Sequence, residues 1–328
     1  MQRTTGRRRK RADRLARRLF YPVEYLVVRG AVAALQSLPI DVAYAVGRAL
    51  GRAACRLDAR HRTVADAQLA RVYGDSLDDE SRERLIGRIY ENLGQNVVDL
   101  AFMARFLRRD NVHRFISLHG SVEETFDLAR RRGCIFVSGH LGNWEVLGAA
   151  LALFDVPLRS IARPLDNPYL DAFLLSIRQA LGQKILGKRG AISNMVRVLK
   201  DRGYLGVLVD QDARHHGVFV DFLGKQAATT SSVATLAYKF DLPIIAGYCR
   251  RVGRGFRFEV RVAPPLYPDP AKPRDEEVRR LTQSYTDLIA AFVLETPDQW
   301  LWVHRRWKTR PEGEADAALR PSFAGAAS

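Results

Sequence analysis

The sequence predicts an α/β protein in which helices flank a central, mostly parallel sheet. From residue 134 onward, short apolar runs alternate with segments of helical periodicity, which is typical of parallel strands joined by helices. The apolar runs are 134–138, 158–162, 204–209 and 242–248, and the helical segments are 143–154, 168–181, 190–202 and 230–240. With 47% hydrophobic and 27% charged residues, the 328-residue chain is neither a disordered polyelectrolyte nor an all-apolar membrane bundle.

Further elements are predicted at both ends of this alternating region. Ser121 and Glu124 have the spacing of a capping box, and they predict a helix that ends at Gly133. Residues 256–266 alternate between apolar and polar side chains, which predicts an antiparallel edge strand. A Pro-rich loop follows, and then a long helix over 275–295.

The predicted organisation follows from these segments and from the composition of the two ends. In chain order it is a basic tail (1–20), a membrane-associating apolar helical segment (21–55), an accessory helical layer (56–118), the α/β core (119–311) and a flexible C-terminal tail (312–328). The accessory layer is inferred from apolar residues that recur every three or four positions.

The positive charge of the chain is concentrated at its N-terminus. The whole chain has a formal net charge of +16, and residues 1–20 hold nine basic residues against Asp13 alone. A run this dense in like charges predicts a solvated tail that binds phosphate groups. The alternative is a tail that only keeps the protein soluble. A strongly basic protein is expected to have anionic partners: nucleic acid, an acidic lipid surface, a phosphorylated substrate or an acidic carrier protein.

The segment at 21–55 is apolar but repeatedly interrupted by charge. Its longest charge-free stretch is 30–40, whereas a membrane-spanning helix needs about 18 or more apolar residues. No signal-peptide cleavage pattern is evident either. We therefore predict an interfacial amphipathic helix whose Leu26, Val27 and Leu35 enter the acyl region of the membrane. An ordinary pair of core helices is the alternative.

The three cysteines indicate neither a disulfide framework nor a zinc site. Cys55, Cys134 and Cys249 lie far apart and form no CxxC pair. This usage fits a reducing, cytosol-facing location.

Polar residues follow three of the predicted strands. Ligands of such sheets bind beyond the carboxyl ends of the strands, so the chemistry is expected there. Residues 139–145 follow the first strand, Arg163 follows the second, and Asp210 and Gln211 follow the third.

A histidine with a carboxylate five residues later can act as a general base with an orienting partner. The pattern occurs four times: His61 with Asp66, His119 with Glu124, His140 with Glu145, and His216 with Asp221. Only His140 directly follows a predicted buried strand, at a Gly-flanked turn that opens a helix. We therefore predict that His140 is the base and that Glu145 holds its ring.

Several blocks of sequence resemble one family when they are taken together. They are SGHLGNWE (138–145), ARPLDNPYLD (162–171), VDQD (209–212), GVFVDFLGKQAATTSSVATLA (217–237) and QWLWVHRRWKTRP (299–311). In this order they resemble the bacterial lipid A biosynthesis acyltransferases, the late acyltransferases that add lauroyl or myristoyl chains. The resemblance runs from about residue 21 to residue 311.

The resemblance implies a glycerolipid-acyltransferase-like fold with a His-x4-Asp/Glu motif and no metal or redox cofactor. It also implies an enzyme on the cytoplasmic face of the bacterial inner membrane, with an acyl carrier protein thioester as donor and a phosphorylated glycolipid as acceptor. The sequence has no GxSxG nucleophile motif, and no cysteine lies at a strand end beside a histidine. We therefore predict direct transfer, in which His140 deprotonates an acceptor hydroxyl and Glu145 stabilises the imidazolium.

Other residues are expected to bind substrate. The backbone amides of Gly142 and Asn143 are expected to stabilise the oxyanion. Arg163 would contact a phosphate or the carrier arm. Asp210 and Gln211 would position substrate or brace the site. The remaining candidates come from the last block: His304, Arg305 and Arg306 for lipid phosphates, with Trp300, Trp302 and Trp307 near the membrane interface.

Three alternatives remain open. Within the acyltransferases, the acceptor can be another glycolipid such as phosphatidylinositol mannoside, or a lysophospholipid. A metallohydrolase would use the ligand set Asp210, Asp212, His215, His216 and Asp221. A nucleic-acid-binding protein would have the charge, but no recognition-helix, RNP or zinc-finger signature accompanies it, so we expect no nucleic acid partner.

Overall fold

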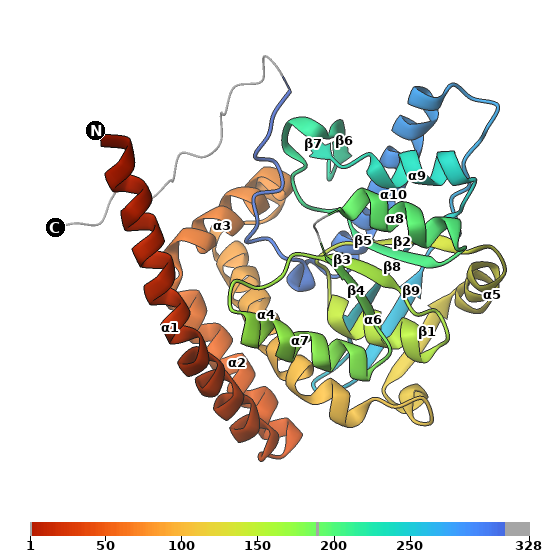
Figure 1. The fold of residues 1–328 in the computed structure, drawn as a ribbon. Coiled ribbons are helices and arrows are strands. Elements are labelled where there is room, and N and C mark those ends of the chain that lie inside the picture. The colour runs from red at the N-terminus through yellow and green to blue at the C-terminus, as the bar shows by residue number, and fades with distance from the viewer. Residues whose placement is uncertain (1, 188–189, 312–328) are drawn as a thin grey trace.

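The computed structural model describes residues 2–187 and 190–311 (Figure 1). Within these residues, the central sheet has seven strands in the order β1-β9-β8-β2-β5-β3-β4. The strands are β1 (Ile116–Gly120), β2 (Cys134–Ser138), β3 (Arg159–Ala162), β4 (Lys184–Gly187), β5 (Tyr204–Leu208), β8 (Ile244–Arg251) and β9 (Phe258–Val262). Only the β8–β9 pair is antiparallel, which confirms the predicted mostly parallel sheet.

Helices cover both faces of this sheet (Figure 1). They are α5 (Val122–Arg132), α6 (Trp144–Leu153), α7 (Pro168–Ala180), α8 (Ala191–Lys200), α9 (Ser232–Phe240) and α10 (Arg274–Glu295). Side chains alternate across the sheet, so Phe136 joins the core with α5 and α6, whereas Val137 joins the core with α8, α9 and α10. The predicted helices at 143–154, 168–181, 190–202, 230–240 and 275–295 are confirmed within a few residues.

Two predictions about local structure are wrong. Strand β9 is antiparallel to β8, as expected, but it is not an edge strand, because β1 pairs with its other side. The capping box at Ser121 is absent: helix α5 begins there and ends at Gly133, but the Ser121 side chain makes no capping hydrogen bond.

Four strands were not predicted from the sequence. They are β1 and β4 of the central sheet, and the two strands of a separate hairpin, β6 (Val218–Phe222) and β7 (Lys225–Thr229). Four short 3₁₀ turns within the described residues complete the structure: η1 (Gly74–Ser76), η2 (Val112–Arg114), η3 (Arg214–His216) and η4 (Pro297–Gln299).

Four long helices precede the sheet: α1 (Gln2–Gln36), α2 (Ile40–Leu57), α3 (Ala59–Tyr73) and α4 (Asp79–Phe106). Helices α2 and α4 pack with their backbones in contact. A Cβ on Gly94 would lie 2.1 Å from the Gly47 carbonyl oxygen, and one on Gly51 would lie 2.3 Å from that of Tyr90. Glycine at these positions therefore lets the two helices touch.

The N-terminal segment differs from the prediction. Residues 2–20 continue helix α1 instead of forming a tail, consistent with the high helix propensity of Arg, Lys, Ala and Leu. Helix α1 packs on α7, where Tyr25 contacts the rings of Tyr169 and Phe173. No helix in the described ranges is both long and apolar enough to cross a bilayer. The C-terminal tail predicted at 312–328 lies outside the described residues.

Candidate active site

His140 lies at the carboxyl edge of the sheet, two residues beyond β2. Its Nδ1 is 2.8 Å from Oδ1 of Asp210, and its backbone N–H donates to Oδ2 of the same carboxylate at 2.6 Å. Asp210 follows β5, and β5 is paired in register with β2, so Ser138 is opposite Leu208. The sheet therefore brings together two residues that are 70 positions apart in the chain.

The Asp210 carboxylate is buried and has several partners. It also accepts a hydrogen bond from Trp300 Nε1 at 2.9 Å, and 1% of the residue is exposed. Burial opposes its charge, but the neighbouring imidazoles of His140 and His304 outweigh burial and hold the pKa of Asp210 far below its usual range. For His140, burial lowers the pKa and Asp210 raises it, and the net result is a raised pKa.

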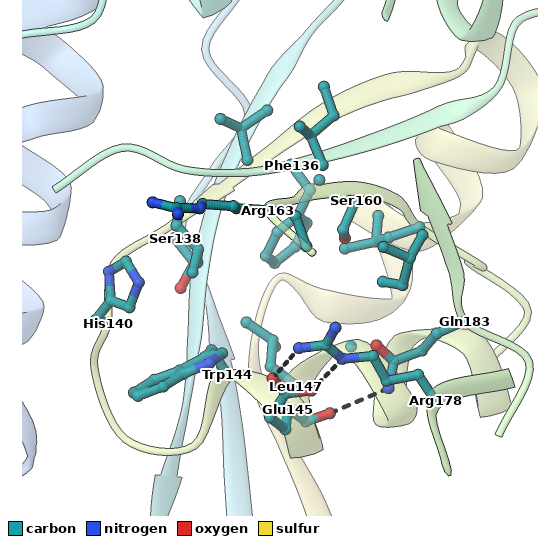
Figure 2. Close-up of a pocket in the computed structure, with 18 of the residues that line it drawn as sticks. Phe136, Ser138, His140, Trp144, Glu145, Leu147, Ser160, Arg163, Arg178 and Gln183 are labelled. Carbon is teal, nitrogen blue, oxygen red and sulfur yellow. Dashed lines mark hydrogen bonds and ion pairs between the residues drawn. The ribbon is translucent and has the colours of Figure 1, made fainter. Parts of the chain in front are cut away.

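Glu145 does not hold the His140 ring, so that prediction is wrong. Its carboxylate forms a two-pronged ion pair with Arg178 of α7, with distances of 2.9 Å to Nε and 2.6 Å to Nη2. Helix α6 begins at Trp144, and Glu145 in its first turn lies on the side of α6 that faces Arg178 of α7. Figure 2 shows Glu145 directed toward Arg178, while His140 lies on the far side of Trp144. The Trp144 and His140 rings pack edge to face at 5.1 Å.

The turn between His140 and α6 is fixed by internal hydrogen bonds. The Gly142 N–H donates to the Gln299 carbonyl at 2.9 Å, and the Asn143 N–H donates to the Cys249 carbonyl at 2.7 Å. The prediction that these two amides form an oxyanion hole is therefore wrong, because both are already bonded to the backbone. The Asn143 side chain caps α6 by accepting from the N–H groups of Glu145 and Val146.

The last sequence block braces the site from behind. Arg306 is fully buried and donates to the Ala228 carbonyl at 2.8 Å and to the Thr229 hydroxyl. Burial lowers the pKa of Arg306 to about 10. The assignment of Arg306 to a lipid phosphate is wrong, because its guanidinium faces the protein interior.

The neighbours of Arg306 have mixed environments. Trp300, Trp302 and Trp307 are 1%, 0% and 5% exposed, so their prediction as interfacial residues is also wrong. His304 is half-buried, and its Nε2 lies 2.9 Å from the Asp210 carbonyl oxygen. Arg305 is exposed, and its predicted contact with phosphate stays a prediction.

A cavity of about 620 Å³ opens beside His140. Apolar side chains from the sheet and from α6 and α8 make up much of its wall: Phe136, Leu147, Leu158, Ile161, Ile185, Met195, Val207 and Leu208. Glu145, Arg178 and Gln183 form one polar flank (Figure 2). Arg163 and Gln211, two predicted substrate contacts, also line the cavity and are exposed to solvent.

The His140 ring is suited to base chemistry at this cavity. Asp210 engages Nδ1, and in the described part of the chain Nε2 has no hydrogen-bond partner. A carboxylate on Nδ1 favours the tautomer that carries its proton there, which leaves the Nε2 lone pair to accept a proton. Within the described residues, the site therefore places a histidine with a free Nε2 beside an apolar cavity.

The metallohydrolase ligand set does not come together. Asp210 holds His140, Asp212 accepts from the Thr309 hydroxyl at 3.0 Å, and Asp221 accepts from the Gly224 N–H in the β6–β7 hairpin. Among the described residues, no group of three His, Cys, Asp or Glu side chains is arranged to hold a metal ion.

Comparisons with known proteins point to one family. The model of the bacterial lipid A biosynthesis acyltransferases matches residues 10–309. The chain is 26% identical to the lipid A biosynthesis lauroyltransferase of Escherichia coli (strain K12), over 84% of this chain and 88% of that protein. It is 25% identical to the phosphatidylinositol mannoside acyltransferase of Mycolicibacterium smegmatis, over 85% and 95% of the two chains. It is 24% identical to the lipid A biosynthesis palmitoleoyltransferase of E. coli, over 85% and 89%.

Proposed function

The chain belongs to the bacterial lipid A biosynthesis acyltransferase family, and we propose that it transfers a fatty acyl chain from an acyl carrier protein thioester to a hydroxyl of a lipid A precursor. It is an acyltransferase acting on lipid. The observation that carries the finer proposal is the His140–Asp210 pair at the mouth of an apolar cavity. Such a cavity suits an acyl chain, and the pair suits the activation of a hydroxyl.

The proposed reaction is a direct transfer. His140 Nε2 takes the proton of the acceptor hydroxyl, whose oxygen attacks the thioester carbonyl. The new C–O bond forms, the C–S bond breaks, and the departing sulfur takes the proton back from the imidazolium. Asp210 stabilises the imidazolium, as the buried aspartate of a Ser-His-Asp triad does. Cys134 is no alternative nucleophile, because it is buried and burial raises its pKa to about 12.

The acceptor distinguishes two candidate functions. The similarity to a phosphatidylinositol mannoside acyltransferase over most of both chains favours that glycolipid class as the second candidate. The deciding experiment mixes the purified protein with acyl carrier protein thioesters and a panel of acceptors: a lipid A precursor, phosphatidylinositol mannoside and a lysophospholipid. Mass spectrometry identifies the product. We expect acylated lipid A precursor, and exclusive acylation of either other acceptor would contradict the proposed acceptor.

We propose that the acceptor reaches the site from the cytoplasmic face of the inner membrane, with α1 lying on the bilayer. Leu19, Val23 and Leu26 recur at helical spacing on α1 and are 76%, 56% and 65% exposed. Val27, on the same stretch, is 66% exposed. Leu35 does not belong to this stripe, because it packs against the core beside α4. An exposed apolar stripe next to a basic segment suits an anionic lipid surface.

Replacing both Leu26 and Val27 with glutamate is expected to release the protein from membranes. The change puts two carboxylates where apolar side chains would enter lipid, so the bound fraction on vesicles with anionic lipid should fall about tenfold or more. Cosedimentation with such vesicles measures it. The control is Leu294→Glu, which changes an exposed leucine of α10. Equal binding by the double variant and wild type would contradict the assignment of α1.

Glu145→Gln is expected to act mainly on stability. It removes the carboxylate that pairs with the largely buried Arg178, at a cost of about 1.5–3 kcal/mol. Turnover should fall less than in Asp210→Asn, because Glu145 does not touch the imidazole. Urea unfolding and pH–rate profiles measure both effects. In an Arg178→Met background, the same change should cost little further stability. If the rate of Glu145→Gln no longer falls at low pH, this prediction is wrong, because Glu145 would then set the pKa of His140.

A further inference from the structure

The cavity floor is built from side chains in register across four strands. Phe136 of β2 is opposite Gly206 of β5, Gly206 is opposite Ser160 of β3, and Ser160 is opposite Ile185 of β4. Partners in register point to the same face of a sheet, and all four residues line the cavity. Two small residues thus lie between two large ones, which leaves a trough in the middle of the row.

The trough runs along the strands away from His140. The row nearest the catalytic edge contains Ser138, Leu208 and Ala162, which also line the cavity. Beyond Ser160 and Gly206 lie Leu158 and Gln183, the lining residues farthest from that edge along the strands. Ala162 and Leu158 are four residues apart, so the trough is about 13 Å long at the strand rise of about 3.3 Å per residue.

Gly206 lies halfway along this trough, at a point with no room for a side chain. A Cβ built on it would lie 2.7 Å from the Ser160 hydroxyl oxygen and 3.0 Å from Leu158 Cδ1, closer than side chains normally pack. Glycine inside a strand weakens the strand, and it often marks a place where a ligand comes close to the backbone. Here the glycine is buried in the middle of a parallel sheet, and it lines the cavity between Ala162 and Leu158.

We propose that Gly206 sets the length of the acyl chain that the enzyme transfers, with Leu158 and Gln183 closing the far end. This inference rests on the proposed function. The thioester lies beside His140, and its saturated chain follows the trough between the sheet and α6. A side chain at position 206 stops the chain halfway, and a smaller side chain at position 158 lets it extend further.

The test uses the full-length protein with an equimolar mixture of decanoyl, lauroyl, myristoyl and palmitoyl acyl carrier protein, and mass spectrometry reads the product distribution. Gly206→Ala and Gly206→Val are expected to shift the product toward shorter chains in that order. One methylene of misfit in an apolar pocket changes discrimination by about 10- to 200-fold. Leu158→Ala is expected to shift the product toward longer chains, which a merely destabilised enzyme would not do.

The matched control is Gly203→Ala, three residues earlier, whose Cβ would lie 2.4 Å from Arg159 Nη1 but outside the cavity. It should lose stability without changing the chain distribution. An unchanged distribution in both Gly206 variants and in Leu158→Ala would overturn the inference.

A second measurement separates this inference from the proposed function. Calorimetry with free fatty acids of the same four lengths reports chain selection without any transfer. A wild type that transfers no acyl chain contradicts the proposed function, and the length preference in binding then still decides the role of Gly206. If neither measurement shows length selection that changes at positions 206 and 158, the inference is wrong.

Discussion

Replacing His140 with alanine is expected to abolish acyl transfer while the protein stays folded. The imidazole is the group at the cavity mouth whose Nε2 lone pair faces no protein partner among the described residues, and general bases contribute about 10²- to 10⁴-fold in rate. The side chain packs mainly on Trp144, so little core volume is lost. Single-turnover transfer from acyl carrier protein thioester measures the effect, and circular dichroism with a melting curve checks the fold.

A matched histidine serves as the control for this variant. His119 also has a carboxylate five residues later in the sequence, but it is exposed on β1 and does not line the cavity. His119→Ala should therefore transfer at the wild-type rate. Wild-type turnover by folded His140→Ala would refute the base assignment.

Asp210→Asn provides the companion test of how the base is held. In the proposed mechanism the neutral imidazole is the active form, so the raised pKa of His140 predicts that activity falls as the pH drops through that raised value. Removing the carboxylate leaves burial as the main influence, and burial lowers the pKa of the imidazole. The acidic limb of the pH–rate profile should therefore move to lower pH. An amide can also donate to Nδ1 and favour the wrong tautomer, so the plateau rate should fall by as much as about 10⁴-fold. An unmoved limb would show that Asp210 does not set the pKa of the base.

The local elements of the fold were predictable from the sequence, but their neighbours in space were not. Hydrophobic periodicity and the residues that begin and end each segment predict β2, β5 and the helices after them, because each of these elements depends on residues close in the chain. Short strands such as β1 and β4 were missed because four or five residues with partly exposed side chains have too little apolar pattern.

The position of His140 was predictable for the same reason, since it follows a buried strand directly. Its partner was not, because only the strand order places β5 beside β2 and so brings Asp210 to the ring. A carboxylate five residues away in sequence is the simpler hypothesis, but α6 turns Glu145 toward Arg178. The buried state of Arg306 likewise depends on contacts with β7, which sequence spacing does not reveal.

A buried ion pair connects the N-terminal helices to the turn that carries His140. Arg251, at the end of β8, donates to Asp99 of α4 at 3.0 Å through Nη1 and also through Nη2, and their side chains are 5% and 0% exposed. Asp99 also accepts from Asn143 Nδ2 at 2.7 Å, and Asn143 is the cap of α6 next to His140. Tyr44 of α2 donates its hydroxyl to the same carboxylate. Asp99 thus joins three helices and a strand.

Asp99→Leu and Arg251→Met are each expected to lower the free energy of unfolding by about 3–5 kcal/mol. Each single change leaves an unpaired charge in a site that water does not reach, and that penalty exceeds the value of the pair itself. The double variant should therefore recover most of the lost stability, because it removes both charges together. Urea unfolding of all four proteins gives the coupling between the two sites. Two singles that each lose less than about 1 kcal/mol would show that the pair is solvated. Asn143 loses its acceptor both in Asp99→Leu and in the double variant. The transfer rate should therefore stay low in the double variant even where its stability returns. That result would separate the role of Asp99 in positioning the turn that carries His140 from its role in stabilising the fold.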